Sequence, residues 1–75
     1  MRRIKQEDKD WIRYKISEYD LFPDLLKDTD PLMIDSLDKI ELVMEIERHF
    51  NITITDDEIG KIKSIFDIHD LIIHK

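Results

Sequence analysis

Residues 36–50, SLDKIELVMEIERHF, carry the strongest periodic pattern in this chain of 75 residues. One side of the pattern is apolar and consists of Leu42, Val43, Ile46 and Phe50. A second side mixes apolar and charged residues, namely Leu37, Glu41, Met44 and Arg48. Because side chains three and four positions apart share a helix face, the spacing predicts an amphipathic helix. Its first face is expected to be buried, and its second face is expected to have no core to cover it.

A helix is also expected over residues 8–19. Ile12, Ile16 and Tyr19 fall on one stripe there, and Trp11 lies beside them at the expected edge of the core.

Two capping patterns predict the remaining helices. Thr55 with Glu58 matches the S/T-x-x-E capping box and is expected to begin a short helix. The apolar residues assigned to it are Ile59 and Ile62. Ser64, with Asp67 three residues later, is expected to cap a last helix. The apolar side of that helix consists of Ile65, Ile68, Leu71 and Ile72.

The connections between these helices differ in length. Residues 20–35, DLFPDLLKDTDPLMID, contain two prolines and interrupt the helical pattern. We expect a long loop that its apolar side chains tie to the core, with Pro23 suited to open a single helical turn. In the connector NITIT, Ile52 and Ile54 are expected to face inward. The predicted fold is an all-α four-helix bundle of three longer helices and one short helix.

Composition agrees with a single domain over residues 1–75, because so short a chain has material for one modest core. Hydrophobic residues make up 41% and charged residues 40%, and there is one glycine. No cysteine is present, which excludes disulfides and thiolate chemistry. The basic N-terminus lacks an apolar signal segment, and no apolar run has membrane-spanning length. A monomer in the cytoplasm, without membrane association, is expected.

The charge pattern indicates protein partners. The net charge is −6, and residues 35–58 contain eight acidic residues against the two bases Lys39 and Arg48. Such a surface repels nucleic acid and attracts basic protein patches.

Ser36 is the candidate functional residue. Asp35 is expected to cap the helix through its carboxylate, which leaves the Ser36 hydroxyl free at the first helical position. An anionic group attached there would meet the positive end of the helix dipole and unpaired N–H groups.

The run DSLDKIELVMEIERHFNITITDDE, followed by KIKSIFDIHDLI, resembles the acyl carrier proteins, which are small acidic four-helix carriers. The resemblance covers residues 30–73 and includes the D-S-L motif at 35–37. It implies that Ser36 carries 4'-phosphopantetheine, installed from coenzyme A by a phosphopantetheinyl transferase. Acyl intermediates would be held on the arm as thioesters for fatty acid, polyketide or related lipid biosynthesis.

The resemblance also implies two further sets of residues. The partner-reading surface would consist of Asp35, Leu37, Asp38, Ile40, Glu41, Met44 and Glu47. The interior that shelters the acyl chain would consist of Val43, Ile46, Phe50, Ile54, Ile59 and Ile62. The implied partners beyond the transferase are acyl-transferring, condensing or acyl-activating enzymes with basic docking patches.

An alternative is an unmodified acidic adaptor that binds a basic protein through residues 36–50. An enzyme is not expected, because no nucleophile with an adjacent base, phosphate loop or metal set can be assembled. His49, His69 and His74 are expected to be surface histidines, since no metal-binding spacing supports them. Residues 56–58 are acidic and are expected to offset a helix dipole rather than bind a cation.

Overall fold

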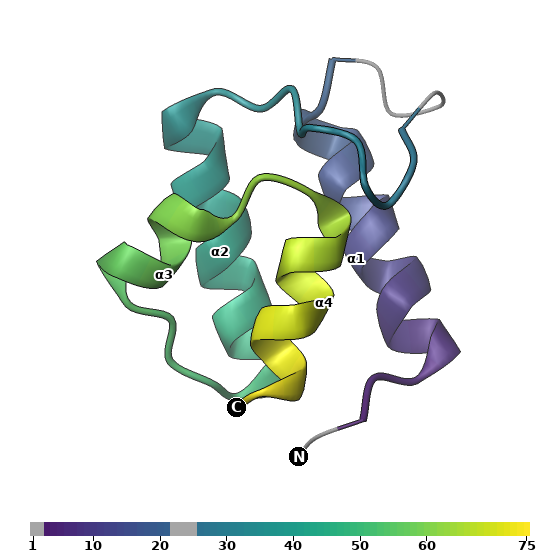
Figure 1. Ribbon diagram of the computed structural model, residues 1–75, viewed down its shortest axis with the longest axis vertical. Helices are drawn as coiled ribbons and strands as arrows, with labels where there is room; N and C mark the ends of the chain where they lie inside the picture. Colours follow the sequence, from purple (N-terminus) through teal and green to yellow (C-terminus); the bar gives the residue numbers. More distant parts are fainter. Residues whose placement is uncertain (1–2, 22–25) are drawn as a thin grey trace.

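The computed structural model describes residues 3–21 and 26–75 and is helical, with no strand in these ranges (Figure 1). Its helices are α1 (Gln6–Tyr19), α2 (Ser36–Phe50), α3 (Asp56–Lys61) and α4 (Ile65–Ile73). The all-α prediction of three longer helices and one short helix is confirmed. The single turn expected at Pro23 lies outside the described residues.

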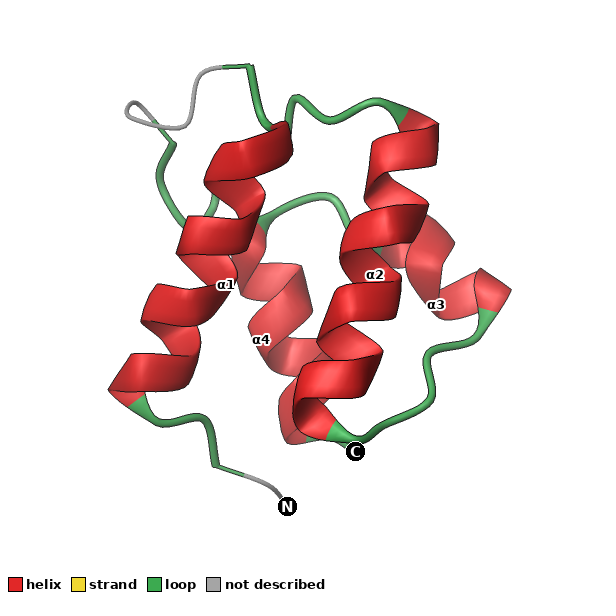
Figure 2. Ribbon diagram, turned by 180° about the vertical axis from the view of Figure 1, so that it is seen from behind, coloured by secondary structure: helices red, strands yellow, loops and turns green. Residues whose placement is uncertain are grey.

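The helices pack as a small bundle around α1. Figures 1 and 2 show that α1 runs in the opposite direction to α2 and α4, and both helices contact it. The short α3 lies beside α2, on the side away from α1. The described end of the long connection, residues 26–35, leads the chain to the start of α2 (Figure 2).

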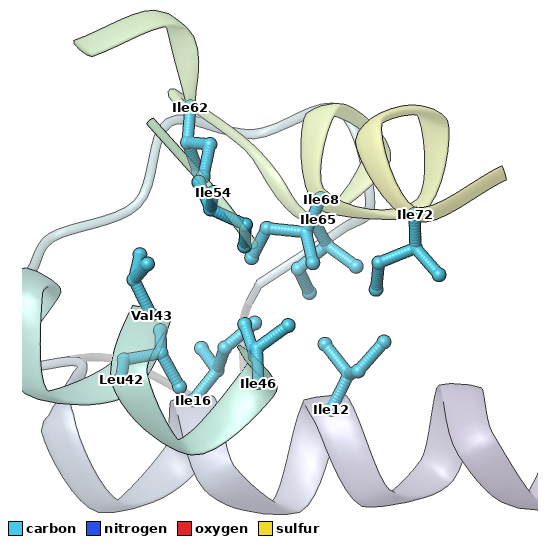
Figure 3. Close-up of a cluster of buried hydrophobic side chains, with 10 residues drawn as sticks. All are labelled: Ile12, Ile16, Leu42, Val43, Ile46, Ile54, Ile62, Ile65, Ile68 and Ile72. Atoms are coloured by element: carbon cyan, nitrogen blue, oxygen red, sulfur yellow. The ribbon is translucent and has the colours of Figure 1, made fainter. Parts of the chain in front are cut away.

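The core is built almost entirely from β-branched side chains. Figure 3 shows residues of α1 and α2 pointing toward those of α4 and the segments that flank α3. Its members are Ile12, Ile16, Leu42, Val43, Ile46, Ile54, Ile62, Ile65, Ile68 and Ile72. Isoleucine has few rotamers to lose on burial, so this composition limits the entropic cost of ordering the core.

The predicted capping box of α3 and the predicted N-cap of α4 are both present, and the α4 cap is a complete capping box as well. Thr55 Oγ1 accepts the Glu58 N–H at 3.2 Å, and Glu58 Oε1 accepts the Thr55 N–H at 3.0 Å. Ser64 and Asp67 exchange equivalent bonds of 3.1 and 3.3 Å at the start of α4. Each box satisfies first-turn donors that would otherwise lack partners, so both helices begin where the sequence indicates.

Two helix boundaries differ from the prediction. The first helix begins at Gln6 rather than residue 8, because the Lys5 carbonyl accepts the N–H groups of Asp8 and Lys9, both at 3.1 Å. That polar first turn has no apolar periodicity to reveal it. At the other end of α3, Ile62 was assigned to the helix but follows it, and its side chain is buried.

The end of α2 is fixed by Asn51, which has φ 55° and ψ 52°. Asparagine tolerates this left-handed conformation better than most residues. The chain then turns so that Ile54 is buried and Ile52 packs partly against the core, as the sequence predicts.

No helix in the described ranges is long and apolar enough to span a membrane.

Candidate functional site

Ser36 is the first residue of α2 and is exposed. Its hydroxyl makes no hydrogen bond with any residue that the structure describes. The expected reason for this freedom was wrong, because the Asp35 carboxylate makes no capping bond. Asp35 instead uses its backbone carbonyl, which accepts the Lys39 N–H at 2.9 Å. The first-turn N–H groups of α2 therefore remain available to an anion, with no carboxylate bound to them.

Contacts on two sides hold the chain just before Ser36. Asp20, at the end of α1, has an 8% exposed side chain, and its Oδ2 accepts the Met33 N–H at 2.8 Å. The Leu32 N–H donates to the Lys63 carbonyl between α3 and α4 at 2.8 Å. These bonds tie the approach to Ser36 to both α1 and the α3–α4 connection. The role of Asp20 was not predicted, because its partner Met33 is 13 residues away in the chain.

The earlier part of the same connection is also anchored. Arg13 of α1 donates to the Leu26 carbonyl at 2.9 Å and contacts the Asp28 carboxylate at 2.6 Å. The Asp28 carbonyl accepts the Phe66 N–H of α4 at 2.9 Å. Apolar anchoring of this loop is confirmed for Leu26, Leu32 and Ile34, which pack against the core. It is wrong for Leu21, which is 71% exposed because the chain leaves α1 there toward solvent.

The outward face of α2 is apolar as well as acidic. Leu37 is 71% exposed, Met44 is 51% exposed and Ile40 is 46% exposed. Glu41 is exposed among them, whereas Asp38 is half-buried. The prediction of a second α2 face without core contacts is therefore confirmed. Such a surface offers small apolar anchors surrounded by negative charge.

Glu47 differs from the other residues assigned to this face. Its Oε2 accepts the Ile54 N–H at 3.0 Å and so fixes the connector after α2. A carboxylate that accepts a backbone N–H in this way contributes to the fold whether or not a partner also binds it.

Glu45 joins α2 to α1 beside the exposed face. Its carboxylate accepts the Tyr19 hydroxyl at 2.8 Å and the Lys15 ammonium at 3.3 Å. The hydrogen bond to Glu45 raises the pKa of Tyr19 to about 12. The same bond from Tyr19, reinforced by Lys15, lowers the pKa of Glu45. At neutral pH these shifts keep Tyr19 protonated and Glu45 ionised, which are the states that form the hydrogen bond. The bond therefore links α1 to α2.

The interior set implied by the resemblance gathers in one place. Val43, Ile46, Ile54 and Ile62 are buried core residues (Figure 3). Phe50 and Ile59 are partly buried and pack against them. Ile62 also lines two surface pockets, of about 190 and 300 Å³. It therefore connects the core to the protein surface.

One of the three histidine assignments was wrong. His74 and His49 are exposed, and the His49 ring stacks on Trp11 with centroids 3.8 Å apart. His69 is partly buried, and its Nε2 is buried without a hydrogen-bond partner. Burial lowers the pKa of His69; Asp28 opposes this shift. The positive charges of Lys9 and Arg13 lower the pKa of His69 further.

The acidic start of α3 behaves as expected for a helix N-terminus. Glu58 closes the capping box and binds the Lys75 ammonium at 2.8 Å. The Lys75 bond and the Thr55 N–H lower the pKa of Glu58 to about 2. No cluster of three or more potential metal ligands occurs among the described residues.

The sequence of the chain is similar to those of known proteins. A family model described as "Phosphopantetheine attachment site" matches residues 24–72. An acyl carrier protein homolog of Mycoplasmopsis pulmonis is 39% identical over an aligned stretch of 75 residues, covering 89% of this chain and 93% of that protein. An acyl carrier protein of Chloroherpeton thalassium is 45% identical over 49 residues, covering 65% of this chain and 61% of the relative. One from Cyanidium caldarium is 47% identical over 47 residues, covering 63% and 55%.

Proposed function

Because the chain belongs to the acyl carrier protein family, whose cofactor is 4'-phosphopantetheine, we propose that it carries this group on Ser36. The observation that carries the proposal is the exposed Ser36 hydroxyl, which is free of hydrogen bonds to described residues and stands at the first position of α2. It lies within the stretch that the family model matches.

The residues around Ser36 fit a phosphodiester. The first-turn N–H groups of α2 have no side-chain cap, so they can face the added negative charge. In the proposed loading step, the Ser36 oxygen bonds to the phosphorus of the coenzyme A phosphopantetheine. The pyrophosphate bond to adenosine 3',5'-bisphosphate breaks, and the serine hydroxyl gives up its proton. When bound, the cofactor supplies a thiol that holds an acyl group as a thioester.

The proposed partners are a phosphopantetheinyl transferase and acyl-handling enzymes of fatty acid, polyketide or related lipid biosynthesis. We assign their docking to the exposed face of α2. The residues of this docking surface are Asp35, Leu37, Asp38, Ile40, Glu41, Met44 and Glu47. Long-range attraction to a basic patch speeds association, while few apolar anchors limit the buried area and permit rapid release. A carrier that visits several enzymes needs both properties.

We further propose that a carried acyl chain enters the interior between α2 and α3. The proposed lining is Val43, Ile46, Phe50, Ile54, Ile59 and Ile62. Residues 1–75 would act in this process as one monomeric domain, and the reactions on the cargo would be performed by the partners. The contact of Ile62 with both core and surface supports this route, since it offers an apolar path inward.

The test is the intact mass after incubation with coenzyme A and a broad-specificity phosphopantetheinyl transferase. We expect the mass of one phosphopantetheinyl group to be added to the native chain and to the Ser17→Ala control. Ser17 is suited to this role because it is an exposed serine in the last turn of α1, away from the start of any helix. The Ser36→Ala variant should gain nothing.

A folded chain that gains no mass with several transferases would contradict the carrier proposal. It would favour the alternative, in which the acidic α2 face binds a basic protein without a prosthetic group. The two proposals also differ in a functional assay, since an adaptor would tolerate Ser36→Ala and a carrier would not.

A further inference from the structure

A pocket of about 300 Å³ opens beside the start of α2. Three segments form it: the end of the long connection, the first turn of α2, and the chain between α3 and α4. Its lining residues are Pro31, Leu32, Ile34, Lys39, Ile62 and Lys63. Of these described lining residues, four are apolar and the other two are lysines.

The cationic character of this pocket stands out against the rest of the chain. The net charge is −6, yet no acidic residue is among the described residues that line the pocket. The ammonium groups of Lys39 and Lys63 form no ion pair with any residue that the structure describes, whereas Lys15 and Lys75 are both paired with glutamates. Two unpaired cations beside an apolar wall suit a ligand that combines an anionic group with an apolar body.

The pocket begins next to Ser36. Lys39 is three residues after Ser36 on α2, and side chains at this spacing are neighbours on a helix surface. Ile34 precedes the serine by two residues and forms part of the apolar wall. A group attached to Ser36 therefore starts within reach of the pocket.

We propose that this pocket receives the root of the phosphopantetheine arm, with Lys39 and Lys63 binding its phosphodiester. The two methyl groups on the neighbouring pantoyl carbon would contact Leu32, Ile34 and Ile62. This inference rests on the proposed attachment at Ser36 and adds a binding site for the arm. At about 30 Å³ for each water-sized group, the volume holds about ten such groups. That space suits the phosphate and pantoyl portion, so the thiol end extends beyond the pocket, where an acyl group on it can be taken by a partner or enter the proposed interior.

The two lysines have a specific electrostatic role in this arrangement. Asp35 and Asp38 flank Ser36 and repel a phosphodiester. An ammonium from α2 and another from the α3–α4 connection offset that repulsion from two directions. A charge-assisted contact of this kind weakens as salt rises, so occupancy of the pocket is expected to fall at high ionic strength.

The experiment compares backbone amide chemical shifts of the apo and phosphopantetheinylated protein by NMR. Loading should shift the amides of Leu32, Ile62 and Lys63. Ile62 and Lys63 are far from Ser36 in sequence, and Leu32 precedes it by four residues. In a loaded Lys39→Gln/Lys63→Gln variant these distant changes should be lost. Lys61→Gln is the matched control, since it removes an exposed ammonium nearby that does not line this pocket, and it should preserve the changes.

Intact mass is measured on every sample, which separates this inference from the proposed function. Absence of added mass at Ser36 contradicts the carrier proposal itself. Loading with shifts confined to residues 35–38, or with distant shifts unchanged in the double variant, overturns the pocket proposal and leaves the carrier function standing. Should Lys39→Gln slow loading, Lys63→Gln alone decides the question, because Lys63 lies outside α2 and the attachment motif.

Discussion

Truncating Ile46 should destabilise the protein more than any change on the outer face of α2. Its side chain is 0% exposed and lies among core residues of α1, α2 and α4 (Figure 3). Ile46→Ala removes three buried carbons and leaves a cavity, which costs about 2–5 kcal/mol in well-packed cores. Ile46→Val removes one carbon and should cost about 0.5–1.5 kcal/mol.

These costs are large for so short a chain. At about 0.05–0.15 kcal/mol per residue, a domain of 75 residues has a free energy of unfolding of about 4–11 kcal/mol. The alanine variant is therefore expected to lose roughly half of that free energy and to unfold partly at moderate temperature. The valine variant should remain folded, with its melting temperature lowered by about 4–8 °C for each kcal/mol lost.

The assay is urea unfolding followed by far-UV circular dichroism, with Met44→Ala as the control. Met44 is 51% exposed on the same helix, so its truncation should change the free energy of unfolding by less than about 0.5 kcal/mol. Equal costs for the Ile46 and Met44 truncations would refute the assignment of the two α2 faces.

The same variant tests the proposed shelter for the acyl chain. A medium-length acyl group on the arm should fill part of the cavity left by Ile46→Ala and recover some of the lost free energy of unfolding. A group that binds the folded state and not the unfolded state raises the free energy of unfolding. An identical deficit in the apo and acylated proteins would show that the chain does not reach Ile46.

Three further outcomes are expected. Thr55→Val removes the hydroxyl of the α3 capping box and should cost about 1 kcal/mol in thermal unfolding, whereas Thr53→Val, at an exposed connector position, should cost little. Because burial lowers the pKa of His69 below 6.5, its contribution to stability is present above that pH and is lost as the pH falls through the lowered pKa. Unfolding measured from pH 7 to 5 should thus show a weaker acid dependence in His69→Gln than in His74→Gln. Glu47→Gln weakens a charged acceptor of a connector N–H and should cost about 1 kcal/mol in urea unfolding; no measurable cost would contradict its structural role.

Much of the helical framework follows from local sequence signals. The two capping boxes and the apolar stripe of α2 involve residues three or four positions apart, and their geometry is set as soon as a helix forms. The position of Ser36 at the first turn of α2 was predictable for the same reason. Whether the Asp35 carboxylate caps the helix was not predictable. Several backbone conformations place an aspartate before a helix without turning its carboxylate toward the N–H groups.

The surroundings of Ser36 depend on contacts between distant segments. Asp20 accepts a bond from Met33, and Lys63 lines the same pocket as Lys39, only because the fold brings residues 31–34 and the α3–α4 connection to the start of α2. The burial of the His69 Nε2 atom also depends on contacts between distant segments, since a polar ring on α4 becomes buried only when other elements pack over it. The sequence by itself determined the four helices, the caps of α3 and α4 and the position of Ser36 at the start of α2, because these rest on neighbours along the chain. The tertiary structure decided which charges are buried, paired or left free around that residue, because burial and pairing depend on how separate helices cross.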